Sequence, residues 1–229
     1  MADSPELNRS LAQYLTSKNL PPDGAWLSSF LATAKLTTPL LALQKSVEYR
    51  LLASDFTHTL DKTRISGLPQ NAIDATVKEK QLQDAVVFQL LDIEDIGRPR
   101  WAQIELIEQH ERGETTRGRE IIRTVRDSED RGPQQPEPSH GPHKMLLQDA
   151  HGTKIYAVEL VPIPGVGLGI GIGAKLLVRR ATIARGLMLL EPSGVEVLGG
   201  KVTVWAEQWQ KDRKQSLKTK LDMPTDSGG

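Results

Sequence analysis

Apolar side chains recur every three or four positions through the first sixty residues, which is the spacing of one face of an α-helix. Residues 21–24, with two prolines, an aspartate and a glycine, break this pattern once, and Thr38 and Pro39 interrupt it again. We predict that Thr38 caps the third helix and Pro39 opens it, because threonine accepts amide hydrogen bonds and proline lacks an amide hydrogen. The apolar positions are Leu7, Leu11, Tyr14 and Leu15, then Trp26, Leu27, Phe30, Leu31 and Ala34, then Leu40, Leu43, Val47 and Leu51. Short helices whose apolar faces need each other predict a three-helix bundle over residues 1–66.

The period changes to that of strands after residue 67. Residues 86–93 are apolar on both faces, with Val86, Phe88 and Leu90 on one side. The other side carries Val87, Leu91 and Ile93. Such a run predicts a strand buried on both faces. Residues 145–148 and 155–160 predict a second and a third strand, joined by a turn at residues 149–152.

The most strand-like stretch is AKLLVRRATIARGLMLLEPSGVEVLGGK, residues 174–201. Its apolar runs at residues 186–190 and 195–198 predict two strands, which bring the total to five, and residues 175–181 form a further short apolar run before them. Residues 191–194, EPSG, have the composition of a turn, so we predict a hairpin between residues 186–190 and 195–198. A helix is predicted from Val202, with Val202, Trp205, Trp209 and Leu217 on one face.

The predicted fold is therefore α+β. The helical bundle packs on a five-stranded barrel of the OB type, which covers residues 67–219 and ends in the C-terminal helix. Residues 220–229 are predicted to form a flexible tail. The Gly-rich run GVGLGIGIGAK is predicted to be a flexible, partly extended connector between the third and fourth strands.

A long insertion, residues 108–141, separates the first two strands of this barrel. Its first half is dense in both charges, and its second half, GPQQPEPSHGP, is too rich in proline to pack a core. Loops of this length are usually functional or disordered. From the residues alone we favour a solvated tether, in which Ile121, Ile122 and Val125 are the apolar residues able to dock.

Composition removes several classes of function. The formal net charge is +0, which takes away the bulk electrostatic argument for nucleic-acid binding. The chain has 0 cysteines, and its acidic, polar N-terminus is no secretory signal. Its longest weakly polar run falls short of the roughly 20 residues of a membrane helix. We expect a soluble protein of the cell interior with no membrane segment.

The sequence contains no catalytic constellation, so we predict no enzyme activity, no cofactor, no metal and no small-molecule substrate. GVGLGIGIGAK lacks the Lys-Ser/Thr ending of a phosphate-binding loop. His140 and His143 are interpreted as exposed loop histidines rather than zinc ligands. Magnesium binding and a solvated strand end account equally well for the acidic cluster of Asp92, Glu94 and Asp95.

Nucleic-acid binding needs a basic groove with aromatic platforms. Only Tyr156 and Trp101 are candidate platforms, so the sequence favours a protein-binding barrel, while weak and salt-sensitive DNA contact stays open. The basic candidates are Arg179, Arg180, Arg185, Lys211, Arg213 and Lys214.

The run LMLLEPSGVEVLGGKV, preceded by GAKLLV, resembles the N-terminal OB-fold region of the family of RecQ-mediated genome instability protein 1. The resemblance implies a non-catalytic subunit that binds topoisomerase III together with a RecQ helicase. It also implies stimulation of decatenation and of double Holliday junction dissolution, in DNA replication, recombination and repair in the nucleus. In relatives an insertion at the position of residues 108–141 reaches into the topoisomerase gate. This resemblance reverses our preference for interpreting residues 108–141 as a solvated tether. The alternative from another class is a stand-alone single-stranded DNA-binding protein.

The resemblance directs attention to a small set of contact residues. Pro99 and Trp101, in GRPRWAQ, form a plausible interface anchor, although Trp101 capping the barrel is an equal alternative. Lys175 resembles a lysine of the family's GTK segment, with an ordinary strand-end charge as the alternative, and Ile121, Ile122 and Val125 complete the set. Animal relatives continue into a second OB domain that recruits a small OB-fold partner. We therefore expect a short, fungal-like form or a truncated one, without that partner.

Overall fold

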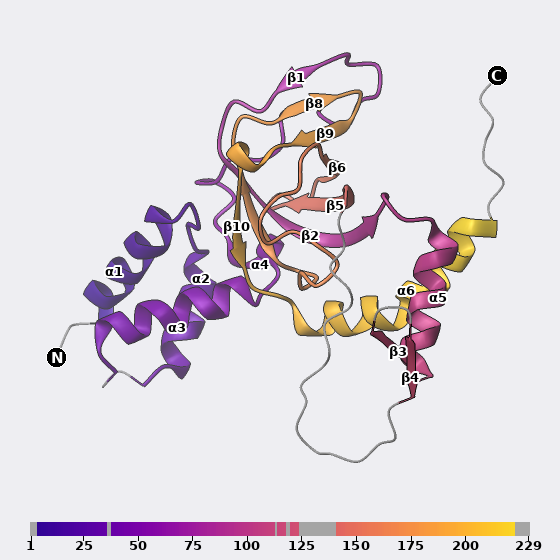
Figure 1. Ribbon diagram of the computed structural model, residues 1–229. Helices are drawn as coiled ribbons and strands as arrows, with labels where there is room; N and C mark the ends of the chain where they lie inside the picture. Colours follow the sequence, from indigo (N-terminus) through magenta and orange to yellow (C-terminus); the bar gives the residue numbers. More distant parts are fainter. Residues whose placement is uncertain (1–3, 36–37, 113, 118–119, 124–140, 223–229) are drawn as a thin grey trace.

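Four helices form a bundle at one side of the molecule in the computed structural model, which describes residues 4–35, 38–112, 114–117, 120–123 and 141–222 (Figure 1). The helices are α1 (Ser4–Ser17), α2 (Gly24–Thr33), α3 (Leu40–Leu52) and the single turn α4 (Phe56–Thr59). Their buried side chains form one core, which includes Leu11, Leu27, Val47, Leu51 and Phe56. The apolar spacing of the sequence thus located the first three helices and most of their inner faces, but Leu40, predicted on the inner face of the third helix, is 45 % exposed, and α4 was not predicted.

The helix starts follow from capping chemistry, with one correction. Asp23 caps α2 by accepting a hydrogen bond from the Trp26 amide at 2.9 Å. For α3 the predicted cap, Thr38, is wrong, because Pro39 occupies that position and makes no side-chain cap bond. Pro39 has a ψ of 143°, which is extended, so the helix cannot begin before Leu40.

The barrel consists of eight strand segments that merge into five long runs. In chain order they are β1 (Lys80–Gln81), β2 (Val86–Asp95), β5 (His143–Asp149), β6 (Lys154–Glu159), β7 (Lys175–Val178), β8 (Thr182–Ala184), β9 (Leu187–Leu190) and β10 (Val195–Gly199). The order in the sheet is β1-β8-β9-β6-β5-β2-β7-β10. β1 pairs with β8 and β2 pairs with β7, so β1–β2 runs along β7–β8. On the other side, β8 pairs with β9 and β7 pairs with β10. The eight segments are therefore five bent strands, and the parallel pair β6–β9 closes the ring.

The predicted hairpin was placed at the wrong turn. β9 pairs with β6 and β8, whereas β10 pairs with β7, so β9 and β10 do not pair with each other. The tight turn lies instead at Arg185 and Gly186, whose φ angles are +49° and +79°. Two positive φ angles are what a two-residue hairpin loop between right-twisted strands requires. The EPSG segment contains a 3₁₀ turn, Pro192–Gly194, which separates β9 from β10.

Strand β2 is shared between two cores, as its apolar pattern predicts. Val86, Phe88 and Leu90 are buried inside the barrel, and Val87 is buried in the helical core. Ile93, predicted on the same side as Val87, lies in the barrel core instead. A register shift between Leu90 and Asp92 displaces the alternation by one residue, which moves Ile93 to the opposite face.

The connector between β6 and β7 is not an extended tether. It forms a series of turns, and Ile163 and Ile172 are buried in the barrel core. Val166, Leu168 and Ile170 pack against that core as well. Its alternating isoleucines, leucines and valines therefore pack against the barrel core, and the glycines between them allow the turns.

Two further helices pack on the barrel. α5 (Arg100–Glu111) follows β2, and α6 (Thr203–Asp222) ends the described chain, with α5 and α6 side by side (Figure 1). α6 starts close to the end of α3 and runs away from the bundle (Figure 1). Trp205 and Trp209 pack on the barrel core and Leu217 is buried, as predicted. Between α5 and β5 a small hairpin is formed by β3 (Glu114–Arg117) and β4 (Glu120–Arg123). No helix in the described ranges is long and apolar enough to cross a membrane.

Candidate partner-binding site

The segment that leaves β2 presents apolar side chains to solvent. Pro99 is the N-cap of α5, and Trp101 follows in the first turn with 60 % of its surface exposed. Its ring therefore lies on the surface and does not close the barrel. Ile96 and Leu106 are exposed nearby in the chain, whereas Ile104 faces inward. A large exposed aromatic on a helix with a packed inner face has the properties of an interface anchor.

Ion pairs hold α5 against α6. Lys214 pairs with Glu111, and the Lys218 ammonium donates to Glu108 Oε1 at 2.9 Å. These residues are at the surface, so the pairs fix the relative orientation of the helices but contribute little stability each. The predicted nucleic-acid residue Lys214 is thus already engaged with carboxylates.

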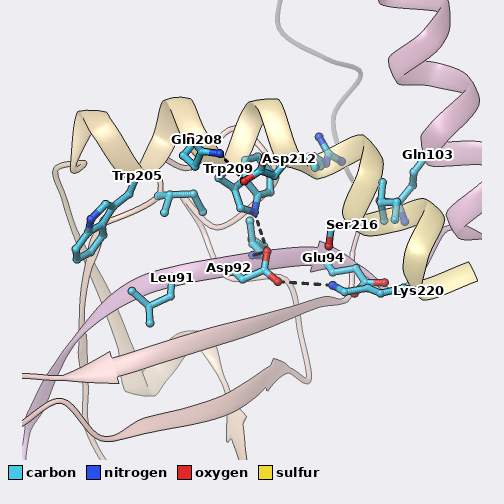
Figure 2. Close-up of a pocket in the computed structure, with 14 residues that line it drawn as sticks. Leu91, Asp92, Glu94, Gln103, Trp205, Gln208, Trp209, Asp212, Ser216 and Lys220 are labelled. Carbon is cyan, nitrogen blue, oxygen red and sulfur yellow. Dashed lines mark hydrogen bonds and ion pairs between the residues drawn. The ribbon is translucent and has the colours of Figure 1, made fainter. Parts of the chain in front are cut away.

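Figure 2 shows a pocket of about 400 Å³ between the end of β2 and α6. At its floor the Trp209 indole donates to Asp92 Oδ1 at 2.7 Å. Lys220 lies 3.6 Å from Asp92 and 3.0 Å from Glu94 (Figure 2). Arg100 also donates to Glu94, at 2.7 Å.

The acidic cluster is thus a docking point for α6. Burial alone would raise the pKa of Glu94, but the hydrogen bonds from Arg100 and Lys220 outweigh it and hold the pKa below its usual value. The two sequence interpretations, a magnesium site and a solvated strand end, both miss these cations. Within the described residues, no group of three acidic, histidine or cysteine side chains is arranged to hold a metal ion.

The basic candidates do not gather into one groove. Arg213 lies over the Trp209 ring, with 5.2 Å to the ring centre, and burial lowers its pKa although Asp95 and Asp92 oppose the shift. Lys211 is exposed on the same helix. The remaining candidates are on the β7–β9 side, away from α6: Arg179 pairs with Glu196 at 3.1 Å, while Arg180 and Arg185 are exposed (Figure 1).

Tyr156 is the exposed aromatic of the barrel wall. Half of its surface is accessible, and Lys144 Nζ lies 4.3 Å from the centre of its ring. Tyr156 stands on β6 and the other candidate platform, Trp101, on α5, so the two platforms share no element with each other or with the basic candidates. The geometry of a stacking groove lined by cations is therefore not assembled from the predicted residues.

Lys175 is buried completely, so the interpretation as a strand-end charge is wrong. Its ammonium donates to the Ser54 carbonyl at 2.8 Å, to the Gly173 carbonyl at 2.6 Å and to Gln89 Oε1 at 3.3 Å. It also lies 4.4 Å from the centre of the Phe56 ring. Burial lowers its pKa to about 7, against the opposing charge of Asp55. Lys175 therefore joins the barrel to the helical bundle, and its charge does not reach the surface.

The apolar residues of the insertion are only partly placed. Ile121 and Ile122 lie in β4 and pair with Thr116 and Thr115 of β3. Val125 lies outside the described residues, as does His140. Side-chain positions are described neither for β3 nor for β4.

His143 is not the exposed loop histidine that the sequence indicated. It begins β5, is 2 % exposed, and pairs through Nδ1 with Glu159. Its interpretation failed because residues 141–143 follow a Pro-rich segment. The signal that was missed is the alternation His143, Met145, Leu147, which places the ring on the buried face of the strand.

The barrel, the bundle and the placement of α5 can now be compared with known proteins. The sequence model described as "RMI1, N-terminal OB-fold domain" matches residues 68–213, and "RMI1, N-terminal helical domain" matches residues 15–59. The chain belongs to the RMI1 family. RecQ-mediated genome instability protein 1 of Schizosaccharomyces pombe is 26 % identical over 227 residues, covering 89 % of this chain and 90 % of that relative.

Longer members of the family match over a smaller share of their length. The Xenopus laevis protein of the same name is 23 % identical over 215 residues, which cover 93 % of this chain but 37 % of the relative. The Mus musculus protein is 27 % identical over 143 residues, 62 % of this chain and 21 % of the relative. The chain thus spans most of the yeast relative and well under half of the vertebrate ones.

Proposed function

We propose that this protein is a non-catalytic subunit of a nuclear complex of topoisomerase III and a RecQ helicase that maintains genome stability. Within it, the chain binds topoisomerase III and stimulates decatenation and double Holliday junction dissolution. Membership of the RMI1 family is the observation that carries this proposal. The relatives are named for RecQ-mediated genome instability, which agrees with a role in DNA replication, recombination and repair.

The structure adds a surface suited to such a partner. The exposed Trp101 lies near the start of the connection between β2 and β5. The same connection contains the long insertion, residues 108–141. Trp101 stands in the first turn of a formed helix, so its backbone does not have to be ordered when a partner covers it. The helix beneath it is fixed by α6, which makes the surface pre-organised.

The proposal is tested by co-migration of the purified chain with topoisomerase III on a sizing column, followed by a decatenation assay. We expect a complex with the full chain and faster decatenation in its presence. Deletion of residues 113–140, which leaves α5 and the start of β5 in place, then separates two contributions: a lost complex shows that the insertion provides affinity, and a retained complex with slower decatenation shows that it modulates the gate. A full chain that migrates alone and leaves strand passage unchanged would contradict the proposal.

A matched pair of substitutions locates the binding surface. Trp101→Ala removes the exposed anchor, and we expect the Kd for topoisomerase III to rise by at least about 30-fold, since hot-spot aromatics contribute about 2 kcal/mol or more. Tyr49→Ala removes an aromatic that is 73 % exposed on α3, in the bundle, and should leave the Kd unchanged. Equal effects of the two substitutions would show that Trp101 is not part of the interface.

A stand-alone single-stranded DNA-binding protein is the alternative function, and it is less well supported. Lys214 and Arg179 are paired with carboxylates, and Arg213 is largely covered. Titration of a fluorescent oligonucleotide at physiological salt tests this alternative. Tight binding that is lost in the double variant R179A/R180A would favour it.

A further inference from the structure

The two ends of the β2–β5 connection meet at one tightly packed place, which we term the root. Asp95 and His143 form the last pair of the β2–β5 ladder. Beyond it the Ile96 amide donates to the Pro142 carbonyl at 2.9 Å. The backbones are so close that a Cβ on Gly97 would lie 2.2 Å from the Gly141 carbonyl oxygen. Only glycine fits at this crossing.

Four polar side chains at the root are almost entirely buried. Their exposed fractions are 1 % for Asp95, 3 % for Gln103, 2 % for His143 and 2 % for Glu159. Burying polar groups destabilises a protein unless each is hydrogen-bonded. Their concentration at one end of the barrel indicates a role in setting geometry.

The outgoing end of the connection is bonded to α5. Asp95 Oδ1 accepts from the Gly97 amide at 2.9 Å, which turns the chain sharply at the end of β2. Gln103 Nε2 then donates to the Asp95 carbonyl at 2.7 Å and to the Arg98 carbonyl at 3.0 Å. The first turns of α5 are therefore tied to the turn from which the helix starts.

The incoming end is bonded to Glu159. One carboxylate oxygen, Oε1, accepts from the His143 amide at 2.9 Å and pairs with the His143 ring. The other oxygen, Oε2, accepts from the Ile163 amide at 3.1 Å. A Cβ on Gly141 would lie 2.7 Å from Glu159 Oε1, so the incoming backbone passes directly over the carboxylate.

A continuous set of contacts thus runs from Glu159 to the exposed face of α5. Glu159 bonds the His143 amide, and the Pro142 carbonyl accepts from the Ile96 amide, next to Gly97. The backbone carbonyls of Asp95 and Arg98 in turn accept from the Gln103 side chain. Trp101 lies two residues before Gln103 on the same helix. Ion pairs to α6 act on the later turns of α5, and Arg100 pairs with Glu94 at its first turn; these contacts are more exposed than the root and add to it.

We propose that His143 and Glu159 are positioning residues that fix the orientation of α5, and with it the Trp101 surface offered to a protein partner. This inference rests on the proposed function, because it assigns these residues to the same binding surface. Neither side chain touches the partner. Their effect on binding is transmitted through the root and is exerted on Trp101.

The experiment is a double-mutant cycle on the affinity for topoisomerase III. H143L/E159L replaces both members of the pair, which avoids leaving one buried charge alone. We expect the Kd of this variant to rise at least about 10-fold, and amide exchange at Ile96, Gly97 and Gln103 to accelerate. If the pair acts through Trp101, adding W101A should weaken binding no further than W101A alone, because residues acting through one contact are not additive.

Three controls separate positioning from general damage. H143Q retains a side-chain N–H that can bond Glu159, and it should restore most of the affinity. H151L changes an exposed histidine at the other end of β5 and should have no effect. G97A drives the two ends of the connection apart without touching the pair, and it should reproduce the weaker binding even if H143L/E159L does not fold.

The outcomes distinguish this inference from the function on which it rests. If the wild-type chain does not bind topoisomerase III, the proposed function is overturned, and the inference with it. If wild type binds, and H143L/E159L and G97A bind equally well, only the inference is overturned. Full additivity with W101A would also overturn it, since it would show that the pair acts elsewhere than through the Trp101 surface.

Discussion

The barrel is flanked by two groups of helices that are attached by different physical means. The bundle α1–α4 shares a continuous apolar core with β2 and β7, to which Val87 and Leu177 contribute. The pair α5–α6 is attached through Trp209 and Leu217, and also through carboxylates of β2 that bond Lys220 and Arg100.

This difference separates stability from adjustability. Apolar burial is not screened by salt and is lost only by unfolding, whereas ion pairs are weakened by salt to the extent that they are exposed. The bundle therefore acts as a fixed wall of the barrel. The attachment of the α5–α6 side, which carries Trp101, depends in part on charges, so its strength varies with salt and pH.

The largest expected effect comes from the apolar attachment. Phe56 is fully buried between the bundle and the barrel, and Phe56→Ala should reduce the free energy of unfolding by about 3–5 kcal/mol. Leu41→Ala, at a position 70 % exposed on α3, should change it by less than about 0.5 kcal/mol. Urea unfolding of both variants measures the difference. A loss below about 1 kcal/mol for Phe56→Ala would show that the bundle is not held by its core.

A pH series tests the one charge inside that attachment. The pKa of Lys175 is lowered from 10.5 to about 7 in the folded protein. Between these values the unfolded chain holds a proton that the folded one lacks, so the stability contributed by this group rises with pH. Above pH 7 the free energy of unfolding of the wild type, relative to that of Lys175→Met, should rise by about 1.4 kcal/mol per pH unit. Below pH 7 the difference between the two proteins should be constant.

Denaturant curves at several pH values between about 6 and 9 make this measurement. Lys175→Met also removes the hydrogen bonds of the ammonium to Ser54, Gly173 and Gln89, so the informative quantity is the change of the stability difference with pH and not its absolute size. Curves for the two proteins that run parallel from end to end would show that the ammonium is not desolvated in the folded state.

The smallest expected effect is on the polar attachment. Glu94→Gln removes the charge that pairs with Arg100 and Lys220 and should lower the free energy of unfolding by about 1–2 kcal/mol at neutral pH. Glu94 has a lowered pKa, so its contribution is present above the unfolded value of 4.5 and is lost as the pH falls below it. Salt should reduce the difference.

Lys214→Ala is the matched control for this polar attachment, because its ion pairs with Glu108 and Glu111 are more exposed. Its effect should be smaller than that of Glu94→Gln and should vanish at about 1 M salt, where the screening length is near 3 Å. Thermal unfolding at two salt concentrations is sufficient. A Glu94→Gln effect independent of both salt and pH would place α6 among the apolar attachments.

Local sequence predicted the elements that depend on local chemistry. The helix faces, the two-sided strand β2 and the aromatic face of α6 all follow from spacing, which is a property of neighbouring residues. The hairpin was misplaced because EPSG and RG both have turn composition, and which turn joins paired strands depends on β6 and β7. The displacement of Ile93 needed a bulge that no residue type announces.

The candidate site was predicted less completely, because burial of charge depends on distant partners. Trp101 was predicted as a contact because it is a large aromatic near Pro99 at the stem of the insertion; it is exposed, and its role as a contact stays a prediction. Lys175 looked like a strand end because the bundle residues that cover it, Ser54 and Phe56, lie more than a hundred positions earlier. His143 was misjudged for the same reason, since Glu159 is 16 residues away on another strand.

Strand β2 has a consequence for folding that extends beyond binding. Its alternate residues belong to two cores, so neither core is complete until this one strand is in place. The helices and the barrel should therefore gain and lose their structure in a single cooperative step, with one set of slowly exchanging amides on β2. In a shortened chain that begins after the bundle, Val87 and Leu177 would be exposed to solvent. Such a chain should aggregate and should not fold as an independent barrel.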